Sequence, residues 1–124
     1  MQTVAVVGAS SDRSKFSNKA VRAYAKRGWK VFPVNPKGEA IEGLQTFRSI
    51  RDIPEKLDRV TIYLPPERGL AVLADIAAAK PTEFYVNPGA ESDEFVAEAQ
   101  RLGLDPILAC SIIEIGERPS SYAG

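Results

Sequence analysis

Thr3-Val4-Ala5-Val6-Val7-Gly8-Ala9-Ser10-Ser11 opens the chain with a β-branched apolar run that ends in glycine and small residues. A short apolar run without alternation is typical of a strand buried on both faces of a parallel sheet. Gly8 permits a tight turn, and the small side chains of Ala9 and Ser10 leave backbone amides accessible to a phosphate. The stretch therefore predicts the first strand and the phosphate loop of an α/β fold. Only one glycine of the G-x-G-x-x-G fingerprint is present, so this loop alone is a weak dinucleotide signal.

Further apolar runs alternate with helical patterns along the rest of the chain. Strands are expected at residues 29–34, 60–64, 83–86 and 106–110. Helices are expected at residues 17–28, 66–80 and 92–103, with shorter elements near 49–53 and 112–115. Parallel strands joined by helices need right-handed crossovers. The pattern predicts a single Rossmann-like, doubly wound α/β domain over residues 1–124, with a five-stranded parallel sheet in the order 3-2-1-4-5 and helices on both faces.

The loops that follow the strands are the candidate binding segments. In an open parallel sheet the carboxyl ends of the strands border one crevice, and ligands bind there. The loops comprise residues 8–13, 35–38, 65–66, 87–89 and the region after Cys110. Several of them hold small or conformationally fixed residues.

The second of these loops contains an informative cation. Pro33-Val34-Asn35-Pro36-Lys37 follows an apolar strand at the place where a nicotinamide-binding domain carries Asp or Glu. A carboxylate there accepts hydrogen bonds from a ribose hydroxyl, whereas Lys37 after a proline-stiffened turn suits a phosphate, which needs a counter-ion. The chain is therefore predicted to hold a phosphorylated nucleotide other than plain NAD.

Basic residues are concentrated at the start of a chain whose net charge is zero. Residues 1–38 contain eight of the 16 basic residues and one of the 16 acids. Charges along the first predicted helix are typical of a solvated face. Arg13, Lys15 and Lys37 differ because they stand in loops at strand ends, and we expect them to contact or steer an anionic ligand. The net charge of zero and the lack of a recognisable nucleic-acid-binding motif argue against nucleic acid as a partner.

The composition excludes several kinds of chemistry. The chain has no histidine and a single cysteine, Cys110, which rules out a histidine-based nucleophile pair, a histidine-ligated zinc and an internal disulfide. No pair of carboxylates has the spacing to share one reacting bond, so we assign no catalytic and no metal-binding residue. No apolar run could span a bilayer, and Met1 leads into a strand without a signal-peptide pattern. We therefore expect no membrane contact and a cytoplasmic location.

Two segments carry a specific family resemblance. Residues 4–12 (Val-Ala-Val-Val-Gly-Ala-Ser-Ser-Asp) and 31–38 (Val-Phe-Pro-Val-Asn-Pro-Lys-Gly) closely resemble the signature segments of the CoA-binding domain family. Its members are the stand-alone relatives of the amino-terminal domain of the succinyl-CoA synthetase alpha subunit. The resemblance covers nearly the whole chain: residues 49–54 look like the family's segment ending in Asp-Ile-Pro, Asn87-Pro88-Gly89 occupies the place of its Gln-x-Gly, and Cys110 falls where the family commonly has cysteine.

The resemblance implies a domain that binds coenzyme A. It places the pyrophosphate near Gly8, Ala9 and Ser10, adenosine and its phosphate near residues 34–37, and residues 63–66 at the border of the ligand. CoA carries a pyrophosphate and a ribose 3′-phosphate, so it would also attract the loop cations. The predicted CoA-binding residues are Gly8, Ala9, Ser10, Ser11, Arg13, Lys15, Val34, Asn35, Pro36, Lys37, Leu64, Pro65, Pro66, Asn87 and Gly89.

The chain departs from the family pattern around its cysteine. The family's usual Arg before the cysteine is Ala109, and its basic and histidine residues after it are replaced by Ser111-Ile112-Ile113-Glu114. The synthetases work through a phosphorylated histidine on a further domain, so we expect no synthetase activity from this chain alone. Cys110 has two interpretations: an inert packed thiol, or a thiol that forms a mixed disulfide with CoA under oxidation.

The predicted function is a non-catalytic or accessory module that binds CoA or an acyl-CoA at the carboxyl edge of the sheet, with a possible partner enzyme. One alternative is an NADP-dependent oxidoreductase or redox sensor in which Lys37 meets the 2′-phosphate. That alternative lacks two fingerprint glycines and an evident proton donor. Another alternative is a protein-interaction subunit whose nucleotide site is vestigial.

Overall fold

A five-stranded parallel sheet forms the centre of the molecule in the computed structural model, which describes residues 1–123. Gly124, the last residue of the predicted domain, lies outside the described residues. The strands are β1 (Thr3–Val7), β2 (Lys30–Val34), β3 (Arg59–Ile62), β4 (Glu83–Val86) and β5 (Pro106–Leu108). The helices are α1 (Phe16–Lys26), α2 (Pro66–Leu70), α3 (Leu73–Ala79), α4 (Asp93–Arg101) and α5 (Ser111–Glu114), with 3-10 turns η1 (Ile50–Asp52) and η2 (Pro119–Tyr122). The predicted α/β class with a parallel sheet is confirmed.

The strand order is β2-β1-β3-β4-β5, which corrects the predicted order 3-2-1-4-5. The reason lies in β2, because Pro33 has no N–H to donate and proline within a sheet is confined to edge strands. The outer side of β2 meets a single bridge, in which the Phe47 N–H donates to the Pro33 carbonyl at 2.9 Å. β3 is buried along its whole length and occupies the centre instead.

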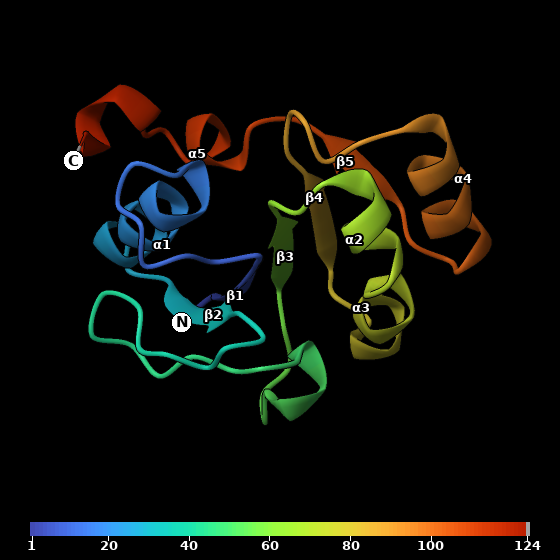
Figure 1. The fold of residues 1–124 in the computed structure, drawn as a ribbon, viewed down its shortest axis with the longest axis horizontal. Coiled ribbons are helices and arrows are strands. Elements are labelled where there is room, and N and C mark those ends of the chain that lie inside the picture. The colour runs from blue at the N-terminus through green and yellow to red at the C-terminus, as the bar shows by residue number, and fades with distance from the viewer. Residues whose placement is uncertain (124) are drawn as a thin grey trace.

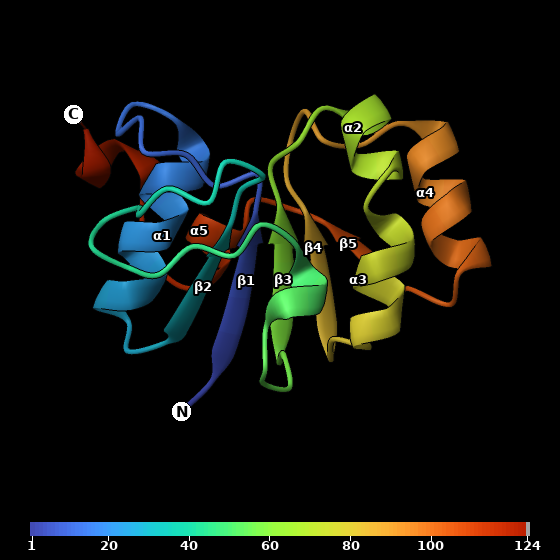
Figure 2. The same ribbon diagram turned by 60° about the horizontal axis from the view of Figure 1, so that its bottom comes forward.

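Helices cover both faces of the sheet, as predicted. α1, α5 and η2 lie on one face, whereas η1 and α2–α4 lie on the other (Figures 1 and 2). Successive side chains of β1 point to opposite faces. Val4 and Val6 accordingly pack in a cluster with α1, while Ala5 and Val7 pack in a cluster with α3 and α4.

The chain changes direction across the sheet between β1 and β3. From β1 it passes to the edge strand β2, and from β3 it proceeds through β4 to β5. In a doubly wound sheet the loops on the two sides of such a switch point separate and leave a crevice at the carboxyl ends of the strands. The pairing of Val7 with Ile62 brings Gly8 beside Leu64 at this point.

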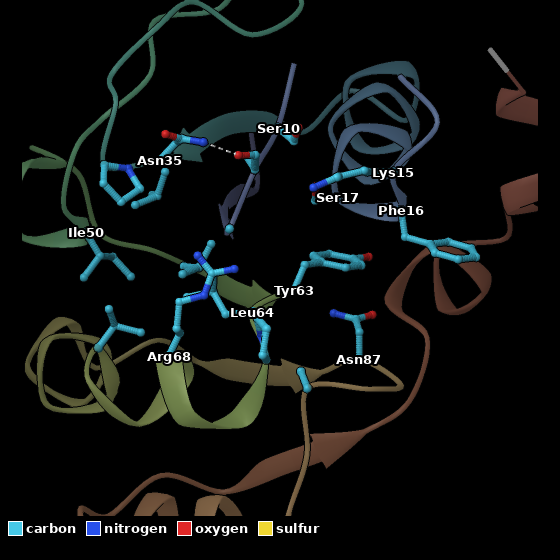
Figure 3. A pocket seen from close by; sticks show the side chains of 18 of the residues that line it. Ser10, Lys15, Phe16, Ser17, Asn35, Ile50, Tyr63, Leu64, Arg68 and Asn87 are labelled. Carbon is cyan, nitrogen blue, oxygen red and sulfur yellow. Dashed lines mark hydrogen bonds between the residues drawn. The ribbon is translucent and has the colours of Figure 1, made fainter. Parts of the chain in front are cut away.

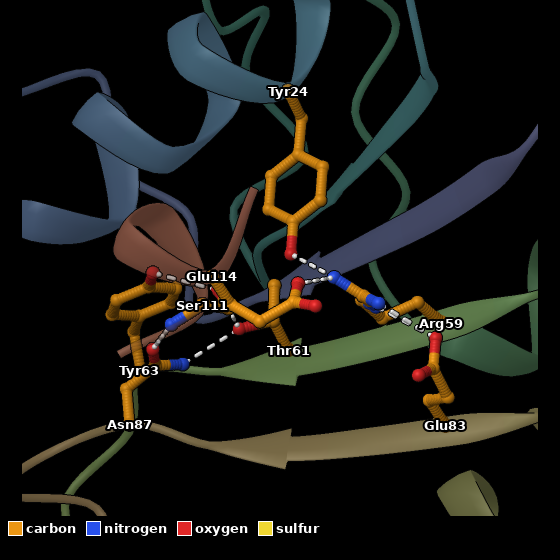
Figure 4. A network of polar contacts seen from close by, with 8 residues as sticks. All are labelled: Tyr24, Arg59, Thr61, Tyr63, Glu83, Asn87, Ser111 and Glu114. Carbon is orange, nitrogen blue, oxygen red and sulfur yellow. Dashed lines mark hydrogen bonds and ion pairs between the residues drawn. The ribbon is translucent and has the colours of Figure 1, made fainter. Parts of the chain in front are cut away.

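One arginine is buried within this scaffold. Arg59 is 5% exposed, and its guanidinium lies between the rings of Trp29 and Tyr85, with its Cζ 4.9 and 4.4 Å from the ring centroids. It also donates to Glu83 and Glu114 at 2.7 and 2.6 Å (Figure 4). Burial alone would lower the pKa of Arg59, but its hydrogen bonds raise the pKa above the ordinary value. The cluster ties α5 to β3 and β4.

The helix expected over residues 66–80 is divided into α2 and α3, which are separated by Ala71 and Val72. Gly69, in the last turn of α2, lies against Phe95 of α4: a Cβ on Gly69 would stand 2.7 Å from the Phe95 Cε1 atom. Glycine also weakens a helix relative to alanine. Gly69 therefore allows α2 and α4 to approach each other closely, and it also favours termination of α2.

We predict that Gly69→Ala destabilises the fold by about 1–3 kcal/mol, because Phe95 is fully buried and has little room to move. Helix propensity alone would give the opposite sign, a gain of about 1 kcal/mol. Urea unfolding measures the change. Ala78→Gly, at an exposed position of α3, is the control for propensity. A Gly69→Ala protein that is more stable than the wild type would contradict the packing argument.

Candidate functional site

A cleft of about 1080 Å³ lies at the carboxyl edge of the sheet, where the loops after β1, β2, β3 and β4 meet. One wall consists of the loops after β1 and β2 with the start of α1, and the opposite wall consists of α2 and the start of α3 (Figure 3). The volume is at the upper end of the range for small-molecule sites, which suits a large ligand.

Most of the residues predicted to bind a ligand line this cleft. They are Gly8, Ala9, Ser10, Ser11, Lys15, Val34, Asn35, Pro36, Lys37, Leu64, Pro65, Asn87 and Gly89. Arg13 and Pro66 are not among the lining residues: Arg13 forms an ion pair with Glu42 (Nη1 to Oε1, 3.5 Å), and Pro66 begins α2. That the lining residues contact a ligand stays a prediction.

The loop after β1 begins with a glycine that the geometry requires. Gly8 has a φ of +85°, and a Cβ there would stand 3.0 Å from the Leu64 Cδ2 atom. The N–H groups of Gly8 and Ala9 both donate to the Val34 carbonyl, each at 3.1 Å. The sequence analysis expected this part of the loop to face a phosphate, but the first two amides are occupied within the protein.

Donors without a partner begin at Ser10. Within residues 1–123 the N–H groups of Ser10, Ser11, Phe16 and Ser17 make no hydrogen bond. Lys15 caps α1 without a side-chain hydrogen bond, and the first helical turn contains no acid. An uncapped helix N-terminus combines unsatisfied donors with a partial positive charge. This junction between loop and helix, together with the Lys15 side chain, can therefore accept a phosphate.

The loop after β2 is held by Asn35 and presents Lys37. The Asn35 Nδ2 donates to the Ala9 carbonyl at 2.7 Å (Figure 3), and its Oδ1 accepts from the Lys37 N–H at 2.7 Å. Asn35 therefore fixes the loop, and its polar atoms are largely occupied. The Lys37 ammonium has no hydrogen bond or ion pair within the part of the chain that the structure describes, so it can meet an anion.

Two lining cations were missed by the sequence analysis. Arg48 donates to the Pro36 carbonyl at 2.9 Å and so lies beside the loop after β2. Arg68 extends from α2 into the cleft (Figure 3). Arg68 was missed because it belongs to the helix expected over residues 66–80, whereas Arg13, Lys15 and Lys37 were selected as cations in loops. No local signal marks Arg48, which reaches the cleft through the long connection between β2 and β3.

The remaining lining residues come from all parts of the chain. They are Val7, Phe16, Ser17, Glu39, Ser49, Ile50, Tyr63, Ala71, Val72, Asp75, Ile76, Pro88, Ala90 and Cys110. Tyr63 was expected at the ligand border by resemblance, and burial raises the pKa of its phenol. It is therefore a hydrogen-bonding group rather than a base at neutral pH.

Asn87 has a structural role that sequence reasoning did not anticipate. It is 1% exposed, and its Nδ2 donates to the Thr61 hydroxyl at 2.6 Å and the Ile62 carbonyl at 3.0 Å. Its Oδ1 accepts from the Ser111 N–H at 2.9 Å (Figure 4). The Asn87 amide therefore joins the end of β4 to β3 and to the start of α5, and it has little capacity left for a ligand.

Cys110 is partly exposed, lines the cleft and lies directly before α5. This position does not distinguish an inert packed thiol from a thiol that forms a mixed disulfide with CoA.

Among residues 1–123, no group of three or more His, Cys, Asp or Glu side chains could hold a metal ion. No helix in the same range has both the length and the apolar character that crossing a membrane requires.

Comparison with known families gives a match that covers most of the chain. Residues 2–116 match the family model of the CoA binding domain. The chain belongs to the CoA-binding domain family. The resemblance identified from the segments after the first two strands is therefore confirmed, and this CoA-binding domain can be compared with larger relatives.

Those relatives are ADP-forming acetate–CoA ligases. The domain is 33% identical over 63 residues to the acetate–CoA ligase [ADP-forming] II subunit alpha of Pyrococcus furiosus, which is 50% of this chain and 14% of that protein. It is 35% identical over 78 residues to the acetate–CoA ligase [ADP-forming] II of Archaeoglobus fulgidus, which is 61% of this chain and 12% of that protein. The chain thus spans a small part of the length of the curated relatives that it matches.

Solved structures include both small and large relatives. A conserved hypothetical protein from Pyrococcus furiosus is 32% identical, with a TM-score of 0.82, and the match covers 92% of this chain and 99% of that one. The dinucleotide-forming acetyl-coenzyme A synthetase 1 of Ca. Korarchaeum cryptofilum is 28% identical, with a TM-score of 0.72, and the match covers 88% of this chain and 26% of that one. The fold therefore occurs both as most of a small chain and as part of a larger protein.

We predict that Asn87→Ala destabilises this CoA-binding domain by about 3 kcal/mol, because it leaves buried partners, including the Ser111 N–H, without hydrogen bonds. Urea unfolding followed by circular dichroism measures the loss. Gln100→Ala, which removes an exposed amide on α4, is the matched control and should change stability by less than about 0.5 kcal/mol. Equal unfolding midpoints for the two variants would contradict the structural role of Asn87.

Proposed function

We propose that this domain binds CoA or an acyl-CoA in the cleft at the carboxyl edge of the sheet, and that it acts as a non-catalytic or accessory module. The observation that carries the proposal is the combination of unpaired backbone donors at Ser10 and Ser11 with the cations Lys15 and Lys37 around one cleft. Family membership supports CoA as the nucleotide, since the matching family is defined by CoA binding.

The pyrophosphate is assigned to the junction between the loop after β1 and α1. The unpaired N–H groups of Ser10, Ser11, Phe16 and Ser17 are of the kind that bind phosphate oxygens, and the helix dipole favours the negative charge. Lys15 adds a full positive charge at the same place. The assignment keeps Ser10 from the expected pyrophosphate contacts, and it replaces Gly8 and Ala9 with Ser11, Phe16 and Ser17.

The adenosine end is assigned to the loop after β2. Asn35 and the Asn35–Lys37 hydrogen bond hold this loop, so the backbone near Lys37 is ordered before a ligand arrives. Lys37 and the neighbouring Arg48 supply the positive charge that a ribose 3′-phosphate requires. Plain NAD, which has no phosphate on that ribose, would leave these cations without a counter-ion.

The accessory role follows from the chemistry of the lining residues. The chain has no histidine, the pKa of Tyr63 is raised, and of the two carboxylates that line the cleft, Glu39 and Asp75, Asp75 is paired with Arg51. The matching ligases are several times longer than this chain. A partner enzyme is therefore the natural source of any acyl transfer that uses the bound CoA.

We predict that CoA binds more tightly than dephospho-CoA and NAD, and that Lys37→Ala reduces the preference for CoA over dephospho-CoA by about three- to tenfold. The expected change in preference is modest because Lys37 is exposed, so that solvent and salt screen its ion pair with the 3′-phosphate of the ligand. Isothermal titration calorimetry of both ligands with both proteins measures the ratio. Lys56→Ala, in the segment that leads into the amino end of β3, is the control for loss of one exposed charge.

Three results would count against the proposal. Equal affinity of the wild type for CoA and dephospho-CoA would overturn the role given to Lys37. Tighter binding of NADP than of CoA would favour the alternative of an NADP-dependent protein. The absence of binding by any of these nucleotides would favour the alternative of an interaction subunit with a vestigial site.

A further inference from the structure

Arg68 is a cation of the cleft to which the proposed CoA contacts give no role. It belongs to α2, on the wall opposite the loops after β1 and β2, and Figure 3 shows its side chain extending into the cleft. Within residues 1–123 its guanidinium makes no hydrogen bond and no ion pair. Other arginines of the chain, such as Arg51, Arg59 and Arg101, are paired with carboxylates. Arg68 is therefore available to a ligand.

Apolar side chains lie beside Arg68 in the cleft (Figure 3). Ile50, Leu64 and Val72 line this part, and all three belong to or pack against the core cluster on this face of the sheet. Two acids line the cleft, Glu39 and Asp75, and Asp75 is paired with Arg51. The unpaired backbone donors and Lys15 lie on the other side of the cleft (Figure 3). An apolar floor below a planar cation suits a flat aromatic group better than a phosphate.

We propose that Arg68 is a specificity-determining residue whose guanidinium stacks on the adenine base of the bound nucleotide, above the apolar floor of Ile50, Leu64 and Val72. This inference rests on the proposed CoA function and deepens it. Arginine is suited to the role because its guanidinium is planar, weakly hydrated and able to stack on aromatic faces. Because the Arg68 guanidinium has no partner within the described residues, no existing ion pair has to break when the adenine base enters the cleft.

The charge distribution argues against a phosphate as the main partner of Arg68. Lys37 and Arg48 lie near the loop after β2, and the backbone donors lie near α1, so each phosphate already has cations or amides elsewhere. The carboxylates of Glu39 and Asp75 line the same cleft, and they repel a phosphate but not a neutral base. Stacking therefore uses the position of Arg68 without placing like charges together.

The experiment compares variants that separate charge from planarity. Calorimetric titrations with CoA and with adenosine 3′,5′-bisphosphate are made on the wild type, Arg68→Ala, Arg68→Lys and Arg68→Phe. Arg68→Ala is expected to weaken both ligands by about three- to tenfold, since stacking contributes at this level at accessible sites. Arg68→Phe is expected to restore most of the affinity, and Arg68→Lys less than half of it on a logarithmic scale. Arg101→Ala, on α4, is the charge-matched control and should bind as the wild type does.

The outcomes distinguish this inference from the function on which it rests. Full rescue by Arg68→Lys and none by Arg68→Phe would show a charge contact to phosphate and overturn stacking. Wild-type affinity in Arg68→Ala would overturn any contact by Arg68 while leaving CoA binding intact. Failure of the wild type to bind either ligand would overturn the proposed function and this inference together. Thermal unfolding of each variant verifies that it is folded, which is expected because Arg68 is exposed.

Discussion

The Val34 carbonyl, which accepts the N–H groups of both Gly8 and Ala9, is the contact on which the geometry of the cleft depends. It ties the loop after β1 to the end of β2, and the Asn35 amide strengthens the connection by donating to the Ala9 carbonyl. Because these groups are paired inside the protein, the first free amides are those of Ser10 and Ser11. The two loops therefore act as one unit, and their internal bonds determine which atoms remain for a phosphate.

A second set of polar contacts joins β3 and β4 to the start of α5. Asn87, Thr61 and Ser111 bind one another below the loops after β3 and β4, while Arg59 joins Glu83 and Glu114 nearer the amino ends of the strands. Buried polar groups are costly unless they are fully paired. Within residues 1–123 the polar side chains of this network have partners, so it can orient α5 while the cleft itself keeps its unpaired donors and cations.

The limits of sequence reasoning can be seen in particular residues. The alternation of apolar strand patterns with helical patterns along the chain was sufficient to predict a parallel α/β fold and the edge at which the cleft lies. The strand order was wrong because Pro33 was used to describe the loop and not as a sign of an edge strand. Asn87 and Arg48 could not be understood from local sequence, since the roles of both depend on residues far away in the chain: Asn87 on Ser111, and Arg48 on Pro36.

The uneven distribution of charge along the chain has mainly a structural use. Arg13 pairs with Glu42, Lys26 and Arg27 pair with Glu117, and Lys30 pairs with Glu55. Four of the eight basic residues of the first 38 thus pair with acids of the later part, and α1 is connected to the segment that follows α5. Lys15 and Lys37 come from this basic start, line the cleft and have no ion pair within residues 1–123, and the amides of Ser10 and Ser11 beside them are also free. In the proposed function, selectivity for a phosphorylated ligand therefore depends on a few unpaired groups in the cleft, and not on the net charge, which is zero.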